Sequence, residues 1–244
     1  MTGTVLRVHD EPGLERFAQG TDGAVMLYPP GVYRAESDTE LLADVVRRGD
    51  HARDRDVLDI GSGGGALALA AAHSGARSVT AVDLSLRSVA ATWLNSRLAR
   101  VPVRVQVRRG DLFGPVAGRR FGLVLSNPPY VPAATPDLPR HRKARCWDAG
   151  PDGRALLDRI CAGVPDVLTP DGTVLLVHSA VCDADATVAA LDRAGLEARE
   201  VARVTVPFGP VMHARAVLLE SRGLVARGQR SEELVVVEGR RHRG

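Results

Sequence analysis

Cysteines are few in this chain, and their placement excludes two classes of protein. Cys146, Cys161 and Cys182 lie far apart among 244 residues, and their number is odd. Disulfide frameworks and zinc sites show close, paired spacings instead. We therefore expect a protein of the cytoplasm that holds no metal.

Long apolar runs are also missing. The longest, residues 66–72, ends at His73, well short of the about 18 residues that a membrane-spanning helix needs. The first residues lack a basic stretch followed by an apolar one, so we expect no signal peptide. Contents of 45% hydrophobic and 25% charged residues are ordinary for a soluble globular protein.

Lysine occurs only at Lys143, so arginine carries most of the positive charge. The net charge is only +3, and acids are interspersed with bases. The pI of about 9.0 therefore does not by itself indicate a nucleic-acid-binding face. Two basic clusters remain: residues 140–145 are a candidate substrate contact, and residues 240–243 are expected to form a solvated, frayed end.

From residue 56 onward, apolar runs typical of strands alternate with helical patterns. Strands are expected over residues 57–60, 79–82, 103–107, 123–126, 173–177, 201–206 and 234–237. Helices are expected over residues 66–73, 85–98, 154–168, 185–194 and 214–221, the second of them capped by Ser85. This alternation predicts an α/β fold with a doubly wound, mostly parallel seven-stranded sheet.

The first 50 residues form a lead-in with one expected helix, over residues 37–46. Ser37 as N-cap and Glu40 three residues later make a capping-box pattern. We find no internal repeat, low-complexity stretch or linker. We therefore expect an N-terminal extension, residues 1–50, followed by one catalytic domain, residues 51–244.

A glycine loop joins the first expected strand to the first helix of that domain. Asp59 lies in the strand, and Gly61, Gly63 and Gly65 follow at alternate positions. Glycines let the backbone turn sharply and let a ligand approach without a Cβ in the way. Taken alone, the loop also fits the dinucleotide pattern G-x-G-x-x-A, or simply a tight turn.

Two further acids narrow the range of ligands that the glycine loop could bind. Asp83 ends the second strand, about 20 residues beyond the glycines, where an acid can hold ribose hydroxyls. Asp111 follows the third strand, where its carboxylate can accept a hydrogen bond from an adenine amino group while Leu112 lies against the ring. Because the carboxyl ends of parallel strands meet at one edge of a sheet, the loop and both acids predict a nucleoside pocket.

The fourth expected strand stops abruptly at Asn127-Pro128-Pro129-Tyr130. Proline cannot donate to a sheet ladder, so the strand must end there. The Asn127 side-chain oxygen and the Pro128 carbonyl are two acceptors on one rigid frame, and Tyr130 offers a flat face. In the amino-methyltransferase motif that these residues resemble, such a frame fixes and polarises an NH₂ group whose lone pair is delocalised.

These motifs carry a resemblance. The loop with Asp83 and Asp111 resembles the S-adenosyl-L-methionine site of class I methyltransferases, and Asn127 to Tyr130 are similar to the [N/D/S]-P-P-[Y/F/W] motif of amino-methyltransferases. The resemblance implies methyl transfer to adenine N6, cytosine N4 or a glutamine amide nitrogen. It implies catalytic roles for Asn127, Pro128 and Tyr130, and cofactor binding by Asp59, Gly61, Gly63, Gly65, Asp83, Asp111, Leu112 and Asn127.

Two flanking segments resemble the HemK family, particularly its short archaeal and eukaryotic branch. The lead-in pattern V-Y-x-P-x-x-D-[ST]-x-L-L is matched at Tyr33, Asp38, Thr39, Leu41 and Leu42, with Ala35 where proline is usual. The Thr39 position borders the cofactor in that family. The later segment W-x-G-G-x-x-G-R is matched at Trp147, Gly150, Gly153 and Arg154, with Ala149 in place of a glycine.

HemK enzymes methylate the glutamine of the Gly-Gly-Gln loop in translation release factors, so the resemblance implies a release factor as the protein substrate. The short branch also uses a small partner subunit. A nucleic-acid adenine N6-methyltransferase, a small-molecule N-methyltransferase and a non-catalytic module that keeps the fold are the alternatives. Residues 207–244 extend past the usual end of the short family, either capping the substrate groove or, as we favour, covering the sheet.

Five other residues are not expected to take part in the chemistry. His178 is expected to be a hydrogen-bonded structural residue, and Trp93 is expected in the core. His141 and His213 are expected at the surface. Cys146 has no identifiable partner base and is not expected to be a nucleophile.

Overall fold

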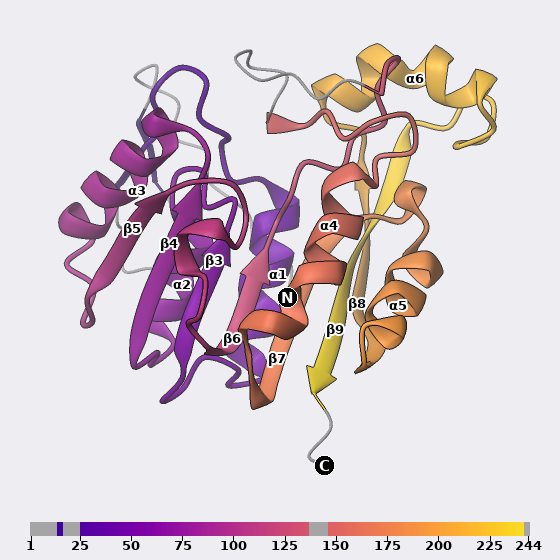
Figure 1. The fold of residues 1–244 in the computed structure, drawn as a ribbon. Coiled ribbons are helices and arrows are strands. Elements are labelled where there is room, and N and C mark those ends of the chain that lie inside the picture. Colours follow the sequence, from indigo (N-terminus) through magenta and orange to yellow (C-terminus); the bar gives the residue numbers. More distant parts are fainter. Residues whose placement is uncertain (1–13, 17–24, 137–145, 242–244) are drawn as a thin grey trace.

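The fold is that of a computed structural model, which describes residues 14–16, 25–136 and 146–241. Seven strands form one sheet in the order β5-β4-β3-β6-β7-β9-β8 (Figure 1). Pairing is parallel from β5 to β7 and antiparallel where β9 meets β7 and β8. The strands are β3 (Asp56–Ile60), β4 (Ser78–Asp83), β5 (Val105–Arg109), β6 (Phe121–Ser126), β7 (Leu168–Ser179), β8 (Leu196–Pro207) and β9 (Ser231–Arg241). The doubly wound, mostly parallel sheet predicted from the sequence is confirmed.

Helices cover both faces of this sheet (Figure 1). Helices α1 (Ser37–Arg48) and α2 (Ala66–His73) share a core with Leu123 and Leu125 of β6, whereas Val124 points to the opposite core. Helices α4 (Ala155–Gly163) and α5 (Ala184–Arg193) contact that second core. The period-two alternation of β6 therefore places its residues in two separate cores, as expected for a buried parallel strand.

The remaining elements are short or peripheral. They are the antiparallel pair β1 (Leu14–Arg16) and β2 (Val25–Leu27), helix α3 (Leu86–Leu98), helix α6 (Pro210–Ser221), and the 3₁₀ turns η1 (Gly114–Val116), η3 (Val164–Val167) and η4 (Ala180–Cys182). Ser85 caps α3 as predicted, its hydroxyl accepting from the Ser88 N–H at 3.4 Å. Among the described residues, no helix combines the length and apolar character needed to cross a bilayer.

Two expectations about helices were wrong. Helix α1 begins at Ser37, so Glu36 is the N-cap and no side chain caps the helix; the expected capping box does not form. Trp93 is 52% exposed instead of buried, because α3 turns Ala91, Thr92 and Asn95 inward. Trp93 lies beside Arg97, whose guanidinium carbon is 5.6 Å from the ring centre, a cation–π contact.

The last strands are longer than the sequence indicated. Charged side chains in β8 and β9 conceal the apolar alternation that would mark a strand in the sequence. In the fold, these charges pair across the two strands, Arg199 with Glu238 and Arg203 with Glu233. The ladder continues to Arg241, which donates to the Leu168 carbonyl at 2.9 Å. The frayed tail expected from residue 240 is therefore wrong for Arg240 and Arg241, which are ordered in β9. Residues 242 and 243 lie outside the described residues.

Candidate active site

A cleft of about 1600 Å³ opens where the carboxyl ends of β3, β4 and β6 meet. One part is lined by residues that follow β3, β4 and β5, and the other by the Asn127 motif and by segments from both ends of the chain. Pockets for one small ligand usually measure about 300–1000 Å³. The cleft is therefore large enough for a cofactor and part of a second molecule.

The glycine loop forms the floor of the first part. Gly61 and Gly63 line the cleft with φ of 73° and 55°, a left-handed backbone that favours glycine. Gly65, with φ of 90°, is absent from the lining. A Cβ there would lie 2.9 Å from the Thr92 side chain, so this glycine lets α2 approach α3.

Asp59 lies beneath the loop and is fully buried. Its Oδ2 accepts a hydrogen bond from the Ala68 N–H at 3.1 Å, which places the carboxyl against the first turn of α2. Burial raises the pKa of Asp59 to about 7. The structure thus brings Asp59 behind the wall of the cleft and not into it.

Asp83 and Asp111 both line the cleft, as their positions after β4 and β5 predicted. Asp83 Oδ2 accepts from the Gly63 N–H at 3.0 Å, and its Oδ1 accepts from the Ser85 N–H at 2.7 Å. Asp111 is paired with Arg159 of α4 at 2.6 Å. Leu112, with φ of 44°, follows Asp111 in the same wall. The loop and both acids therefore come together around one space.

The Asn127 motif lines the second part of the cleft. Asn127 Nδ2 donates to the Thr39 hydroxyl at 3.0 Å, which holds the amide in one orientation. Its Oδ1 is then the end of the amide that can accept from a donor in the cleft. Thr39 is only 4% exposed and lies behind Asn127, so it acts on the site through that side chain.

Asp38 is the centre of a hydrogen-bond network around the motif. Its Oδ2 accepts from the hydroxyls of Tyr33 at 2.7 Å and Tyr130 at 2.9 Å, and its Oδ1 accepts from the Thr39 N–H at 2.6 Å. Burial, and then the charge of Asp38, raises the pKa of both tyrosines well above their ordinary value. The hydroxyls therefore stay protonated and donate, which fixes the Tyr130 ring.

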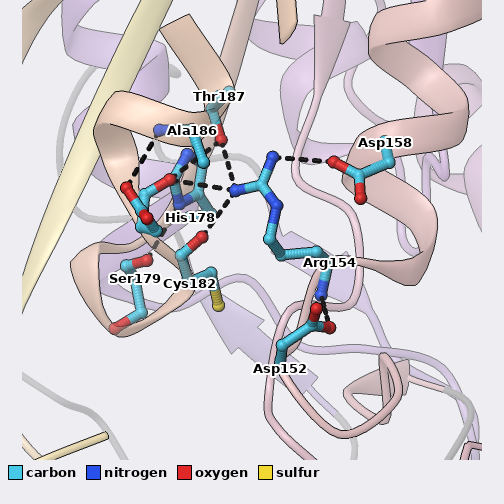
Figure 2. Close-up of polar contacts among 9 residues, drawn as sticks. Asp152, Arg154, Asp158, His178, Ser179, Cys182, Ala186 and Thr187 are labelled. Atoms are coloured by element: carbon cyan, nitrogen blue, oxygen red, sulfur yellow. Dashed lines mark hydrogen bonds and ion pairs between the residues drawn. The ribbon is translucent and has the colours of Figure 1, made fainter. Parts of the chain in front are cut away.

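A second network holds the backbone of the motif (Figure 2). Arg154 Nη1 donates to the carbonyls of Cys182 at 2.6 Å and Asp183 at 2.9 Å and to the Thr187 hydroxyl at 3.1 Å, and Nη2 pairs with Asp158 at 2.7 Å. The planar guanidinium presents several donors in a fixed geometry. Arg154 therefore fastens η4 and the start of α5 to α4.

Cys182 passes this constraint to the motif, because its thiol donates to the Tyr130 carbonyl at 2.9 Å. Burial raises the pKa of Cys182, so the thiol stays neutral. Gly153 packs against the same carbonyl, and a Cβ at its φ of 79° would collide with the Tyr130 oxygen and the Cys182 sulfur. Nearby His178 is buried with its Nδ1 2.8 Å from the Ser179 oxygen, and burial lowers its pKa to about 4. Its predicted structural role is confirmed.

Helix α6 forms a wall of the cleft beside the motif. Val211 and Met212 line the cleft, and Met212 packs in a cluster with Val131 and Phe208. Arg215 donates to the Pro132 carbonyl at 2.9 Å and pairs with Asp148. Our favoured expectation, that the C-terminal segment only covers the sheet, is therefore wrong for α6, which lies over the ends of β8 and β9 (Figure 1).

Comparison with known proteins extends these observations. A family model for the methyltransferase small domain matches residues 26–138. One relative is a Methanocaldococcus jannaschii protein to which protein N5-glutamine methyltransferase activity is assigned by inference. The two sequences are 31% identical over 192 residues, which are 78% of this chain and 94% of that protein. The chain belongs to the HemK-type family of protein N5-glutamine methyltransferases.

Other relatives of this HemK-type methyltransferase are longer. The release factor glutamine methyltransferase of Xylella fastidiosa is 34% identical over 157 residues, 59% of this chain and 54% of that protein. The chain thus spans about half the length of that relative. Among solved structures, the E. cuniculi Mtq2–Trm112 complex matches with a TM-score of 0.60 at 20% identity, covering 87% of this chain and 99% of that one. That likeness shows the shared fold.

The HemK-type chain is an S-adenosylmethionine-dependent methyltransferase. The residues of the first part of the cleft fit this cofactor. The Cβ-free backbone at Gly61 and Gly63 and two carboxylates line a space of sufficient size. When bound, the cofactor supplies the methyl group, and the protein supplies position and electrostatics.

Several residues of the site were missed by sequence reasoning. Arg159 belongs to no motif, and no sequence signal marks it as part of the site. Glu232 lies in a strand of mixed character, and α6 lies beyond the motifs altogether. Cys146 is partly buried, with its thiol 3.5 Å from the Gly31 carbonyl, and His213 is at the surface as expected. The cluster 140–145, with His141, lies outside the described residues.

Proposed function

We propose that this enzyme methylates the side-chain amide nitrogen of a glutamine in a translation release factor. The names of the Xylella fastidiosa and Geobacter sulfurreducens relatives specify release factor glutamine methylation. The E. cuniculi complex is described as responsible for methylation of the termination factor eRF1. The main structural support is the orientation of the Asn127 amide. Thr39 holds this amide so that its oxygen can accept from an NH₂ group in the cleft.

The proposed chemistry follows from that orientation. The nitrogen of an amide is a poor nucleophile because its lone pair is delocalised into the carbonyl. Asn127 Oδ1 and the Pro128 carbonyl accept its two N–H groups, while the fixed Tyr130 ring supports the planar amide. Overall, the S–CH₃ bond of the cofactor's sulfonium would break, an N–CH₃ bond would replace one N–H bond, and the proton would leave to solvent. Orientation and preorganised electrostatics supply the rate.

We propose that the cofactor contacts Gly61, Gly63, Asp83, Asp111 and Leu112, all of which line the cleft, and borders Asn127. Asp59, Gly65 and Thr39 are buried behind these residues, and we assign them supporting roles: they hold α2, α3 and Asn127 in place. We also propose that residues 1–50 are an extension of the catalytic domain, because α1 packs in the same core as α2.

The test is transfer of labelled methyl from S-adenosylmethionine to a purified release factor, with Asn127→Ala as the control. We expect label on the glutamine of the Gly-Gly-Gln loop. The variant should lose about 10²–10³ in rate, by analogy with the loss of an oxyanion donor, and should still bind cofactor. Cofactor binding without label on the release factor would refute this substrate, and ribosomal protein, nucleic acid and metabolites would be tested in its place.

We further propose a small partner protein and a cytoplasmic location, where release factors act. A partner fits the outer side of α3 and the edge strand β5. There Leu86, Trp93, Leu94 and Leu98 of α3 are all exposed, and they are four of the seven large exposed apolar side chains among the described residues. Light scattering of the chain co-expressed with a candidate partner checks this: no complex, or a complex unaffected by Trp93→Ser with Leu98→Ser, would contradict it.

A further inference from the structure

Glu232, near the start of β9, is a buried acid that the proposed chemistry does not use. It lies opposite Val206 of β8 and is only 6% exposed. It lines the cleft, and we place it in the second part, with the Asn127 motif, which is called the acceptor part from here on. Ser179, seen at the start of η4 in Figure 2, hydrogen-bonds to its carboxylate. The Oε2 atom is buried and has no hydrogen-bond partner within the described residues. Buried polar atoms are normally paired, so an unpaired carboxylate oxygen in a cleft indicates a missing donor.

The surroundings indicate the kind of donor. The charges that act most strongly on Glu232 are those of Asp38 and Glu36, and both are negative. Together with burial, which is the larger cause, they raise the pKa of Glu232 to about 6. Asp38 already accepts from two tyrosines and from Thr39. A cation placed here would meet a region of negative potential and would favour the ionised form of Glu232.

Apolar side chains in the cleft that Glu232 lines indicate the shape of that cation. Pro207, Val211 and Met212 line the same cleft and are apolar. Arginine and lysine side chains bury their methylene stems along apolar surface while the charged end contacts a polar group. A cleft that combines apolar lining with a buried carboxylate therefore fits a long cationic side chain better than a short neutral donor.

We propose that Glu232 is a specificity-determining residue, whose Oε2 receives the cationic end of an arginine or lysine flanking the methyl-accepting glutamine. This inference rests on the proposed function, because it takes the substrate to be a peptide segment. Asn127 and Tyr130 would hold the glutamine, while Glu232 would select the sequence around it. Neither the glycine loop nor Asp111 takes part in binding this cationic side chain, so cofactor binding is independent of Glu232.

The test measures binding separately from methyl transfer. Fluorescent peptides with a central Gly-Gly-Gln carry one arginine, moved from four residues before the glutamine to four after. A matched set carries citrulline, which is neutral and nearly isosteric. Anisotropy with saturating S-adenosylhomocysteine gives each Kd for the wild type, for Glu232→Gln and for Glu233→Gln. Glu233 is a matched control, since it is exposed on the other side of β9 and pairs with Arg203.

We expect at least one arginine peptide to bind the wild type about tenfold or more tightly than its citrulline partner, the range of a charge-assisted hydrogen bond. Glu232→Gln should abolish that preference without changing the affinity for S-adenosylhomocysteine, and Glu233→Gln should keep it. The preference should also decline below pH 6 in the wild type only. The other ionisable groups facing Glu232 are Asp38, Glu36, Tyr130 and Cys182, and they are common to both proteins.

Other outcomes separate the two proposals. If arginine and citrulline peptides bind the wild type equally, or if no peptide binds, the Glu232 subsite is wrong even where release factor is methylated. If the arginine preference appears and disappears with Glu232→Gln, but release factor receives no methyl group, the subsite stands and the acceptor protein is a different one.

Discussion

Asp38 shows how one buried carboxylate can organise one side of a site through its hydrogen bonds. Its two oxygens receive hydrogen bonds from Tyr33, Tyr130 and Thr39, and Thr39 in turn holds Asn127. Asparagine at this position has the same shape, but only one of its two ends can accept, so either the two tyrosine hydroxyls or the Thr39 N–H would lose their acceptor. Replacing Asp38 would therefore loosen the orientation of both Asn127 and Tyr130.

We expect Asp38→Asn to lower kcat by about tenfold to a hundredfold, because Tyr130 and Asn127 lose their fixed orientation. The Kd for S-adenosylmethionine should change little, since Asp38 lies at the acceptor part of the cleft. Single-turnover methyl transfer and calorimetric cofactor binding measure the two quantities. A variant that binds cofactor much more weakly while retaining its rate would contradict this role.

At the scale of the element, the segment between β6 and α4 positions the motif through contacts of its backbone. Gly153 permits the close approach of the Tyr130 carbonyl, Cys182 donates to that carbonyl, and Arg154 fastens η4 to α4. The resemblance to the HemK family marked Gly153 and Arg154 but gave no reason for them. The reason is that both hold the Tyr130 backbone in place.

We expect Gly153→Ala to reduce methyl transfer by about tenfold or more and to destabilise the fold. The added Cβ costs about 1–2 kcal/mol from its left-handed backbone, and it also displaces the Tyr130 carbonyl. Gly195→Ala is a matched control, because Gly195 has a φ of 83° and nothing within 4 Å of an added Cβ. Denaturation curves and methyl-transfer rates are measured for both variants. Equal losses of activity in the two would show that backbone strain alone is responsible, and not displacement of the Tyr130 carbonyl.

The stability of the whole molecule depends on buried groups whose pKa values shift in opposite directions. Burial raises the pKa of Asp59 from 3.8 to about 7, so the folded protein binds a proton that the unfolded chain has released. Stability from this group is present below pH 4 and is lost as the pH rises to 7. His178 acts the other way: its pKa falls from 6.5 to about 4, so stability is lost as the pH falls through that window.

Comparison of Asp59→Asn with the wild type isolates the first of these effects. We expect the wild type to lose about 4 kcal/mol relative to the variant between pH 4 and pH 8, the equivalent of a shift of about three pKa units. Urea denaturation at several pH values gives the difference, and the contribution of His178 cancels because both proteins keep it. A difference that does not vary with pH would show that Asp59 is ionised throughout.

The order of the elements, and the residues that line the first part of the cleft, could be predicted from sequence patterns alone. Helix α2 and the ends of β3, β4 and β6 lie where the patterns placed them, and Gly61, Gly63, Asp83 and Asp111 share one space. These features are local: a strand, a glycine turn and an acid at a strand end follow from neighbouring residues, and parallel pairing brings the ends together.

What lies behind and opposite those residues depends on tertiary packing and could not be predicted. Asp59 and Thr39 are buried supports, Trp93 is exposed, and α6 forms a wall instead of covering the sheet. Each depends on which distant element packs against it, as Glu232 depends on Ser179, 53 positions earlier in the chain. The acceptor part of the cleft is assembled from α1, the β6–α4 segment, α6 and β9. Sequence patterns carry no information about contacts at such separations, so the residues that would choose the substrate became visible only in the fold.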